Sequence, residues 1–423
     1  MRRSPAALLT AVAWAALATS VAVAEDYTVH RFERMQLTDT YYSEGIGVGD
    51  INGDGTDDVV YGPYWFAGPD YQIKHEIYAA VPQPRNGYAD HFFAWVYDFT
   101  GDGFSDVFTV GFPGTPAYVY ENPGSGGFDE HWKKHQVFDW VSNESPQLTQ
   151  LVGDERPELV CTREGYFGYC TIDWSKPLES WTFHPVSEQV ATPRFGHGLG
   201  IGDVNSDGRL DILHKDGWFE QPDSLEGDPK WASHNVNFAR AGGAEMYAYD
   251  VDGDGDNDVI TSLAAHEFGL AWYEQIQEGD RRVFRPHQIL GDKAEDNRYG
   301  LVFSEPHSVN LADIDGDGLK DIVTGKTYWS HHMQSPMWDA GAVVYWFKLS
   351  RTDDGVDWIP YRADDDSGIG RQVVVHDVNE DGLPDILAGG MKGAHVLIHK
   401  REAVDRQAWE AAQPTPIAGD TGG

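Results

Sequence analysis

Short apolar segments recur along this chain, and turns rich in glycine and carboxylates separate them. An apolar or glycine-spaced segment comes before each turn, as at residues 45–49 and 246–249. A β-branched segment such as 321–324 follows the turn, and then an aromatic segment such as 345–347. Short segments of this composition between turns are typical of β-strands. The pattern therefore predicts an all-β protein built from one repeated unit.

The repeat has a regular length and a recognisable fourth strand. Its turns begin at residues 50, 98, 150, 203, 250, 313 and 377, a period near fifty residues, which suits a four-stranded propeller blade. Five fourth strands carry an aromatic residue followed by a histidine, for example Trp231 and His234, and Trp358 with Tyr361 is a variant of this signature. Because these histidines recur by position, we interpret them as packing residues. The prediction is a seven-bladed β-propeller of four-stranded blades over residues 25–400.

The two ends of the predicted propeller complement one another. The fourth-strand signature also appears at the start of the chain, in Tyr27, His30 and Phe32, before any blade has begun. The last repeat, in turn, ends after its third strand, near His395–His399. We expect the N-terminal strand to complete the last blade and close the ring, which removes an open sheet edge. Residues 401–423 are expected to form a short helix, up to residue 412, and a flexible tail.

The turns themselves have the chemistry of calcium loops. In residues 313–321, carboxylates stand at positions 1, 3, 5 and 9, with glycines at positions 4 and 6. Hard oxygen ligands at this density suit Ca²⁺, and the strand that follows distinguishes the loop from an EF-hand. Six such loops predict about six Ca²⁺ ions. The predicted ligands are Asp50, Asn52, Asp54 and Asp58; Asp98, Thr100, Asp102 and Asp106; Asp203, Asn205, Asp207 and Asp211; Asp250, Asp252, Asp254 and Asp258; Asp313, Asp315, Asp317 and Asp321; and Asp377, Asn379, Asp381 and Asp385.

A seventh loop, at residues 150–158, has diverged. Gln150 and Val152 replace its first two ligands, so we expect no metal there. The two cysteines, Cys161 and Cys170, follow this loop on the second and third strands of the same repeat. We predict a disulfide between them, with two free buried thiols as the alternative.

Residues 1–24 have the features of a secretory signal. Arg2 and Arg3 precede an apolar run, and small residues end it at Ala24, where we expect cleavage. No later stretch is apolar enough to span a bilayer. The formal net charge of −37 disfavours nucleic acid and anionic membranes as partners. The protein is expected to be secreted or periplasmic.

The acidic loops resemble FG-GAP/VCBS repeats, the blades of integrin-α-like β-propellers, over about residues 27–400. The resemblance implies calcium binding and a propeller, but such families include adhesion modules, sugar-binding domains and lyases. Residues 272–274, 326–329 and 376–386 are also similar to the propeller domain of aldos-2-ulose dehydratase, an enzyme type that dehydrates keto-sugars. This chain has no room for the cupin domains of the fungal enzyme, so an isomerase activity is not implied.

One ring of residues is the best candidate for chemistry. The residue six positions before each acidic loop should lie at the channel rim opposite the loops. Ionisable side chains there are unexpected in a purely structural ring. The ring residues are Glu44, Phe92, Glu144, His197, Ala244, His307 and Arg371. With their neighbours on that face, the predicted catalytic residues are His197, His307, Arg371, Glu245, His266, Lys326 and Tyr328.

These residue types suit β-elimination or dehydration of a sugar. Removing a proton beside a carbonyl group requires a base and a positive charge that stabilises the enolate. Histidine suits the base, while Arg371, Lys326 or a second divalent metal bound by histidines suits the positive charge. The alternative is a non-catalytic adhesion, glycan-binding or protein-interaction scaffold with a hydrated polar channel. A transition metal besides calcium would favour the enzyme.

Overall fold

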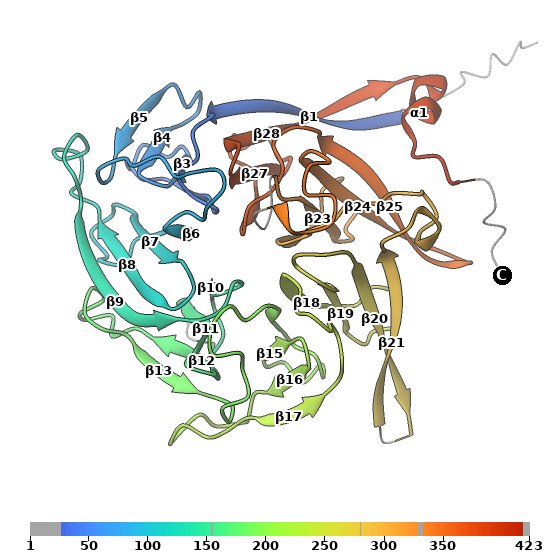
Figure 1. The fold of residues 1–423 in the computed structure, drawn as a ribbon, viewed down its shortest axis with the longest axis horizontal. Helices are drawn as coiled ribbons and strands as arrows, with labels where there is room; N and C mark the ends of the chain where they lie inside the picture. The colour runs from blue at the N-terminus through green and yellow to red at the C-terminus, as the bar shows by residue number, and fades with distance from the viewer. Residues whose placement is uncertain (1–26, 154, 280, 329–332, 418–423) are drawn as a thin grey trace, which may run out of the picture.

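The computed structural model describes residues 27–153, 155–279, 281–328 and 333–417, so the predicted signal segment 1–24 lies outside the described residues. The β-sheets form a ring around a central axis (Figure 1). The chain is an all-β propeller, as the repeat predicts. None of the helices in the described part has the length and apolarity needed to cross a membrane.

Five sheets contain four strands each, and consecutive strands in them pair antiparallel. Three of these sheets come first along the chain. They consist of β2 (Gly47–Gly49), β3 (Asp58–Tyr61), β4 (Tyr64–Ala67) and β5 (Ile73–Glu76); of β6 (His91–Tyr97), β7 (Asp106–Gly111), β8 (Thr115–Glu121) and β9 (Lys133–Val141); and of β10 (Gln147–Thr149), β11 (Glu158–Arg163), β12 (Tyr166–Thr171) and β13 (Thr182–Pro185).

The two other four-stranded sheets lie near the end of the chain. They consist of β22 (Val309–Ala312), β23 (Asp321–Lys326), β24 (Val343–Thr352) and β25 (Gly355–Asp364); and of β26 (Val373–His376), β27 (Asp385–Gly390), β28 (Gly393–Val404) and β1 (Tyr27–Thr38). A short 3-10 helix, η1 (Ala294–Asp296), precedes the first of them.

The remaining sheet has eight strands, so the structure shows five four-stranded blades and one larger sheet where the sequence predicted seven four-stranded blades. It joins β14 (Leu199–Gly202), β15 (Asp211–His214), β16 (Gly217–Glu220) and β17 (Ala232–Asn235) to β18 (Glu245–Tyr249), β19 (Asp258–Ser262), β20 (Leu270–Glu278) and β21 (Arg281–Leu290). The junction is a parallel pairing of β14 with β18, in which Gly200 faces Met246. A Cβ atom on Gly200 would lie 2.0 Å from the carbonyl oxygen of Met246, so only glycine allows the two strands to approach this closely.

The first strand closes the ring. β1 pairs antiparallel with β28 from Tyr27 opposite Val404 to Thr38 opposite Ala394 (Figure 1). Both strands are longer than the sequence predicted. Because β28 continues to Val404, the C-terminal helix α1 (Arg406–Ala412) begins at residue 406 rather than 401, with Asp405 accepting a hydrogen bond from the Ala408 amide.

The fourth-strand histidines pack as predicted. The imidazole of His234 stacks on Trp218 with ring centroids 4.1 Å apart, and His287 stacks on Trp272 at 4.3 Å. Nε2 of His287 also lies 2.7 Å from a carboxylate oxygen of Glu274 on the neighbouring strand. Both histidines lie on the outermost strands of their sheet, β17 and β21, at the edges farthest from the inner strands β14 and β18.

The ninth residue of each acidic loop fastens the loop to the sheet. Asp321 is fully buried, and its two carboxylate oxygens accept hydrogen bonds from the Ile314 amide (3.0 Å) and the Leu349 amide (2.9 Å). Asp58, Asp106, Asp211, Asp258 and Asp385 make the same pair of bonds. In the diverged loop, Glu158 still accepts from the Leu151 amide at 2.8 Å. This carboxylate therefore has a structural role in every repeat.

Cys161 and Cys170 are free, buried thiols, where the sequence predicted a disulfide. Cys161 lies opposite Gly168 and Cys170 lies opposite Leu159, so the two cysteines are diagonal neighbours in the β11–β12 pair. Diagonal Cα atoms in an antiparallel pair are about 7–8 Å apart, beyond the reach of most disulfides.

Candidate metal centre at the channel mouth

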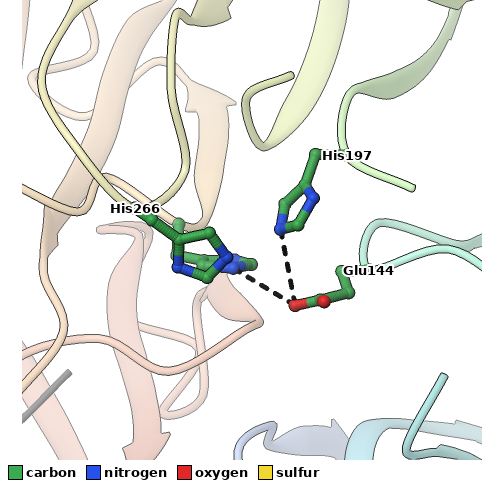
Figure 2. A group of neighbouring side chains, drawn as sticks. Glu144, His197 and His266 are labelled. Carbon is green, nitrogen blue, oxygen red and sulfur yellow. Dashed lines mark ion pairs between the residues drawn. The ribbon is translucent and has the colours of Figure 1, made fainter. Parts of the chain in front are cut away.

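Four side chains of types that can ligate a metal come together near the axis of the ring. They are Glu144 from the β9–β10 connection, His197 before β14, His266 from the β19–β20 connection and His307 before β22. One ligand atom from each lies within 4.8 Å of those from the others. Figure 2 shows His197 and His266 directed toward Glu144 from different parts of the chain. His197 lies just before β14, and an acidic loop begins just after β14. The cluster and the acidic loops therefore lie at opposite ends of the inner strands.

Backbone bonds between neighbouring repeats hold these segments in place. The Glu144 amide donates to the Gly196 carbonyl at 2.8 Å, which fixes Glu144 beside the His197 segment. The Glu305 amide donates to the Glu267 carbonyl at 2.6 Å, which links the His307 and His266 segments. Phe195 and Glu305, each two residues before a histidine of the cluster, both have left-handed backbones, with φ of 61° and 59°. Such conformations in residues other than glycine are uncommon and concentrate at functional sites.

One carboxylate oxygen is the centre of the cluster. Oε2 of Glu144 lies 3.3 Å from Nε2 of His307, 3.6 Å from Nε2 of His197 and 3.5 Å from Nε of Arg371. The three imidazole centroids are 4.8–5.2 Å apart. Glu144, His307 and Arg371 are buried, so these groups interact with little screening by water.

The hydrogen bonding of His197 leaves one of its ring nitrogens available to a cation. Its Nδ1 lies 3.0 Å from the Phe195 carbonyl oxygen, which can only accept, so Nδ1 carries the proton. Nε2 then carries a lone pair that faces the Glu144 carboxylate, 3.6 Å away. Nε2 makes no hydrogen bond with the described residues. Nδ1 of His307 is also buried without a hydrogen-bond partner in the described part of the chain. A divalent cation among these lone pairs would satisfy them, and a backbone carbonyl that orients a histidine is typical of metal sites.

The charge states suit metal binding. Burial lowers the pKa of His197, and burial together with Arg371 lowers the pKa of His307 to about 3. The pKa of His266 is lowered by burial and by the neighbouring His307 and Arg371. Burial alone would raise the pKa of Glu144, but His307, His197 and Arg371 hold it below its usual value. Three neutral imidazoles and one carboxylate are a donor set for zinc or another first-row transition metal.

A second layer of buried charges surrounds the cluster. The Arg371 amide donates to the Glu44 carbonyl at 2.9 Å, and the hydroxyl of Tyr41 donates to the fully buried Glu44 carboxylate. Burial raises the pKa of Glu305 to about 7, although Ser335, Lys326 and Arg371 oppose the shift.

The predicted catalytic residues divide into two groups. His197, His266 and His307 come together, with Arg371 beside them. Glu245 lies deeper, where it accepts from the Val309 amide at 2.8 Å and lines an axial cavity of 290 Å³.

Lys326 and Tyr328 lie outside the four-residue cluster. The Lys326 ammonium group donates to the Thr327 carbonyl at 3.0 Å, and the ring of Tyr328 lies under Lys392. Glu305 is absent from the predicted set. Its one sequence signal is its place two residues before His307, which matches the place of Phe195 before His197.

In two of the acidic loops, three carboxylates converge within 4.8 Å, as a cation site requires. These groups are Asp250, Asp252 and Asp254, and Asp313, Asp315 and Asp321. In the first loop, Asp50 accepts from the amides of Gly53 (2.7 Å) and Gly55 (2.9 Å), and these hydrogen bonds close the turn. The geometry is compatible with metal binding and does not select calcium.

No family model matches this chain, and no curated protein matches it. Similar folds occur among solved structures. One is a lectin from Agrocybe aegerita, described as recognising non-reducing terminal N-acetylglucosamine, with a TM-score of 0.42 and 13% identity over 90% of this chain and 87% of the lectin. Another is rhamnogalacturonan lyase YesW, with a TM-score of 0.41 and 12% identity over 87% of this chain and 72% of the lyase. Because the sequence identities and TM-scores are this low, neither protein indicates the function of this chain, and the site is the basis for it.

Proposed function

We propose that this protein is an exported, calcium-binding propeller that acts on carbohydrate as a metal-dependent carbon–oxygen lyase, either a sugar dehydratase or a polysaccharide lyase. The observation that carries the proposal is the convergence of four side chains, Glu144, His197, His266 and His307. Within this group, the Nε2 lone pair of His197 faces the Glu144 carboxylate. A hydrated channel without chemistry does not require buried neutral imidazoles around one carboxylate, so the cluster favours the enzyme over the scaffold.

The chemistry follows from the donor set. A divalent metal in this cluster would polarise a carbonyl or carboxylate oxygen of the sugar and acidify the adjacent C–H bond. The elimination removes that proton, breaks the C–O bond at the next carbon and releases water or an alcohol, which leaves a carbon–carbon double bond.

The groups around the cluster have distinct roles in this proposal. Because ligation would use the lone pairs of the histidines, the base is a different group. Glu305, a buried carboxylate with Lys326 and Arg371 as charged neighbours, is our candidate for removing the proton. Arg371, 3.5 Å from Glu144, positions that carboxylate and adds positive charge near the developing enolate.

The remainder of the proposal concerns the scaffold. We count each half of the eight-stranded sheet as one blade, since each half has four consecutive antiparallel strands, and this gives seven blades of FG-GAP/VCBS type. The acidic loops bind Ca²⁺, except that Lys348 competes with the ion for Asp315 and Asp317 in the loop at residues 313–321. Cleavage near Ala24 delivers the protein to the periplasm or the medium. Carbohydrate is the expected partner.

Metal analysis and a substrate screen test the function. The full mature chain should contain a transition metal in addition to calcium, and His197→Ala and His307→Ala should lose it. His287→Ala, on the outer strand β21, is the matched control and should retain it. Keto-sugars and uronic-acid polysaccharides are screened by ultraviolet absorbance of the new double bond. Calcium as the sole metal and no product from any substrate would instead support the binding scaffold.

A further inference from the structure

A row of aromatic side chains begins at the metal cluster and leads to the surface. It consists of Tyr88, Phe112 and Phe195, which we call the aromatic shelf. The ring centroids of Phe112 and Phe195 are 5.4 Å apart, and those of Tyr88 and Phe112 are 5.5 Å apart. The Arg371 guanidinium lies 5.9 Å from the centroid of Tyr88, and the Phe195 carbonyl accepts from His197. Tyr88 therefore lies against Arg371, which borders the metal centre, and Phe195 contacts His197 through its backbone.

Phe195 is an unusual residue for its position. Its side chain is 41% exposed, although most large hydrophobic side chains of this protein are buried. Its backbone is left-handed (φ 61°), and its amide donates to the Ser142 carbonyl at 2.8 Å. Glycine or asparagine would adopt this φ at lower cost. An exposed phenylalanine in a strained conformation beside a polar centre indicates contact with a ligand.

Arg194 adds a positive charge to the shelf. Its guanidinium lies 4.7 Å from the ring centroid of Phe195 and 5.2 Å from that of Phe112, and its Nε donates to the Pro113 carbonyl at 2.6 Å. Among the described residues no carboxylate forms an ion pair with Arg194, although the chain has 68 Asp and Glu against 31 Lys and Arg. A fixed guanidinium without a carboxylate partner suits recognition of a ligand carboxylate.

We propose that the aromatic shelf is the sugar subsite and that it takes a sugar bearing a carboxylate, that is, a uronic acid residue. Aromatic rings present a rigid apolar surface with a polarised face, so Phe195 and Phe112 bind the C–H face of the pyranose ring. The carboxylate of the sugar pairs with Arg194. A neutral keto-sugar would leave that charge without a partner. The inference rests on the proposed lyase function and narrows its substrate to acidic sugars.

Isothermal titration calorimetry of the full mature chain tests the subsite. The probes are trimers of galacturonate, glucuronate, mannuronate and guluronate, each compared with the neutral trimer of the same hexose. At least one acidic trimer should bind about ten-fold or more tightly than its neutral counterpart. Arg194→Gln should abolish that preference. Phe195→Ala should lower the affinity for the acidic trimer about five-fold or more, while Phe195→Tyr should bind it like the wild type.

Matched controls separate the shelf from general effects of charge and aromatic loss. Arg281→Gln, at the start of β21, removes an exposed arginine elsewhere, and Phe104→Ala removes an aromatic ring from an acidic loop. Both variants should bind like the wild type. Metal content is measured in every variant, so loss of the metal centre is distinguished from loss of the shelf. Equal affinity for acidic and neutral trimers, no binding of any acidic trimer, or unchanged binding in Phe195→Ala overturns the proposal.

Discussion

Lys348 directs its ammonium group into the acidic loop at residues 313–321, where Nζ lies 2.5 Å from the carboxylate of Asp317 and also pairs with Asp315. Lys348 stands on β24, two residues after the stacked Trp346. At the same place in β20 stands Glu274, which hydrogen-bonds His287 instead. This acidic loop therefore contains a positive charge of the protein itself among its carboxylates.

We expect Lys348→Met to bind one more Ca²⁺ per chain than the wild type, because methionine keeps the packing volume and leaves Asp315 and Asp317 without their cation. Calcium titration and elemental analysis of chelator-treated, reloaded protein measure the stoichiometry. Glu274→Gln, at the matching position, should not gain an ion. The same calcium count in wild type and Lys348→Met would contradict the prediction.

The ninth loop residue should matter more for stability than the other predicted metal ligands do. Asp258→Ala leaves the amides of Val251 and Gln275 buried without acceptors, so it should lower the free energy of unfolding by about 3 kcal/mol. Asp254→Ala should have little effect in chelator, since that side chain is exposed. Urea denaturation in the presence of chelator compares the two, and equal losses would show that the ninth carboxylate is not a structural anchor.

Ring closure predicts an asymmetry between the ends of the chain. Deleting residues 25–34 removes most of β1 and leaves the edge of β28 unpaired, so a large fall in melting temperature is expected. Ending the chain at Val404 removes α1, whose Trp409 packs on Tyr27 with centroids 5.3 Å apart, and should cost less. Calorimetry of both truncations is the measurement, and a smaller loss from the N-terminal deletion would refute the closure role.

Arg371 should be essential for folding stability as well as for function. Arg371→Ala leaves the carboxylates of Glu144 and Glu44 buried without its positive charge, and the expected loss is about 3 kcal/mol. The double variant Glu144→Gln with Arg371→Met removes charges of both signs and should recover part of that loss. Guanidinium denaturation measures both, and an unaltered stability in Arg371→Ala would argue against a buried charge network.

The two cysteines should behave as inert thiols. Burial, together with the neighbouring Cys161, raises the pKa of Cys170, so little thiolate is present at neutral pH. A thiol reagent should label neither Cys161 nor Cys170 in the native protein and both in denaturant. Protein without reactive thiols after denaturation under non-reducing conditions would instead indicate a disulfide.

Local periodicity was sufficient to predict the propeller and its closure. A strand depends mainly on residues near it in sequence, so the repeat near fifty residues and the unmatched signature of Tyr27, His30 and Phe32 identify the elements and the pairing of the two ends. Periodicity could not predict that β14 would join β18, because that pairing depends on how closely two inner strands approach across Gly200.

The candidate site, like the fold, was predicted in part by the sequence and decided in part by the tertiary structure. Equal spacing before each acidic loop is visible in the sequence, and it selects Glu144, His197 and His307 as one ring. His266 comes from a different connection, and the exposed Phe195 lies next to His197. Both placements depend on left-handed turns and on backbone bonds between neighbouring repeats. Likewise, Lys348 reaches Asp317 because strand pairing brings together residues that are 31 positions apart. Side-chain direction and contact between repeats are properties of the folded ring, and they decide which of its ionisable groups form a site.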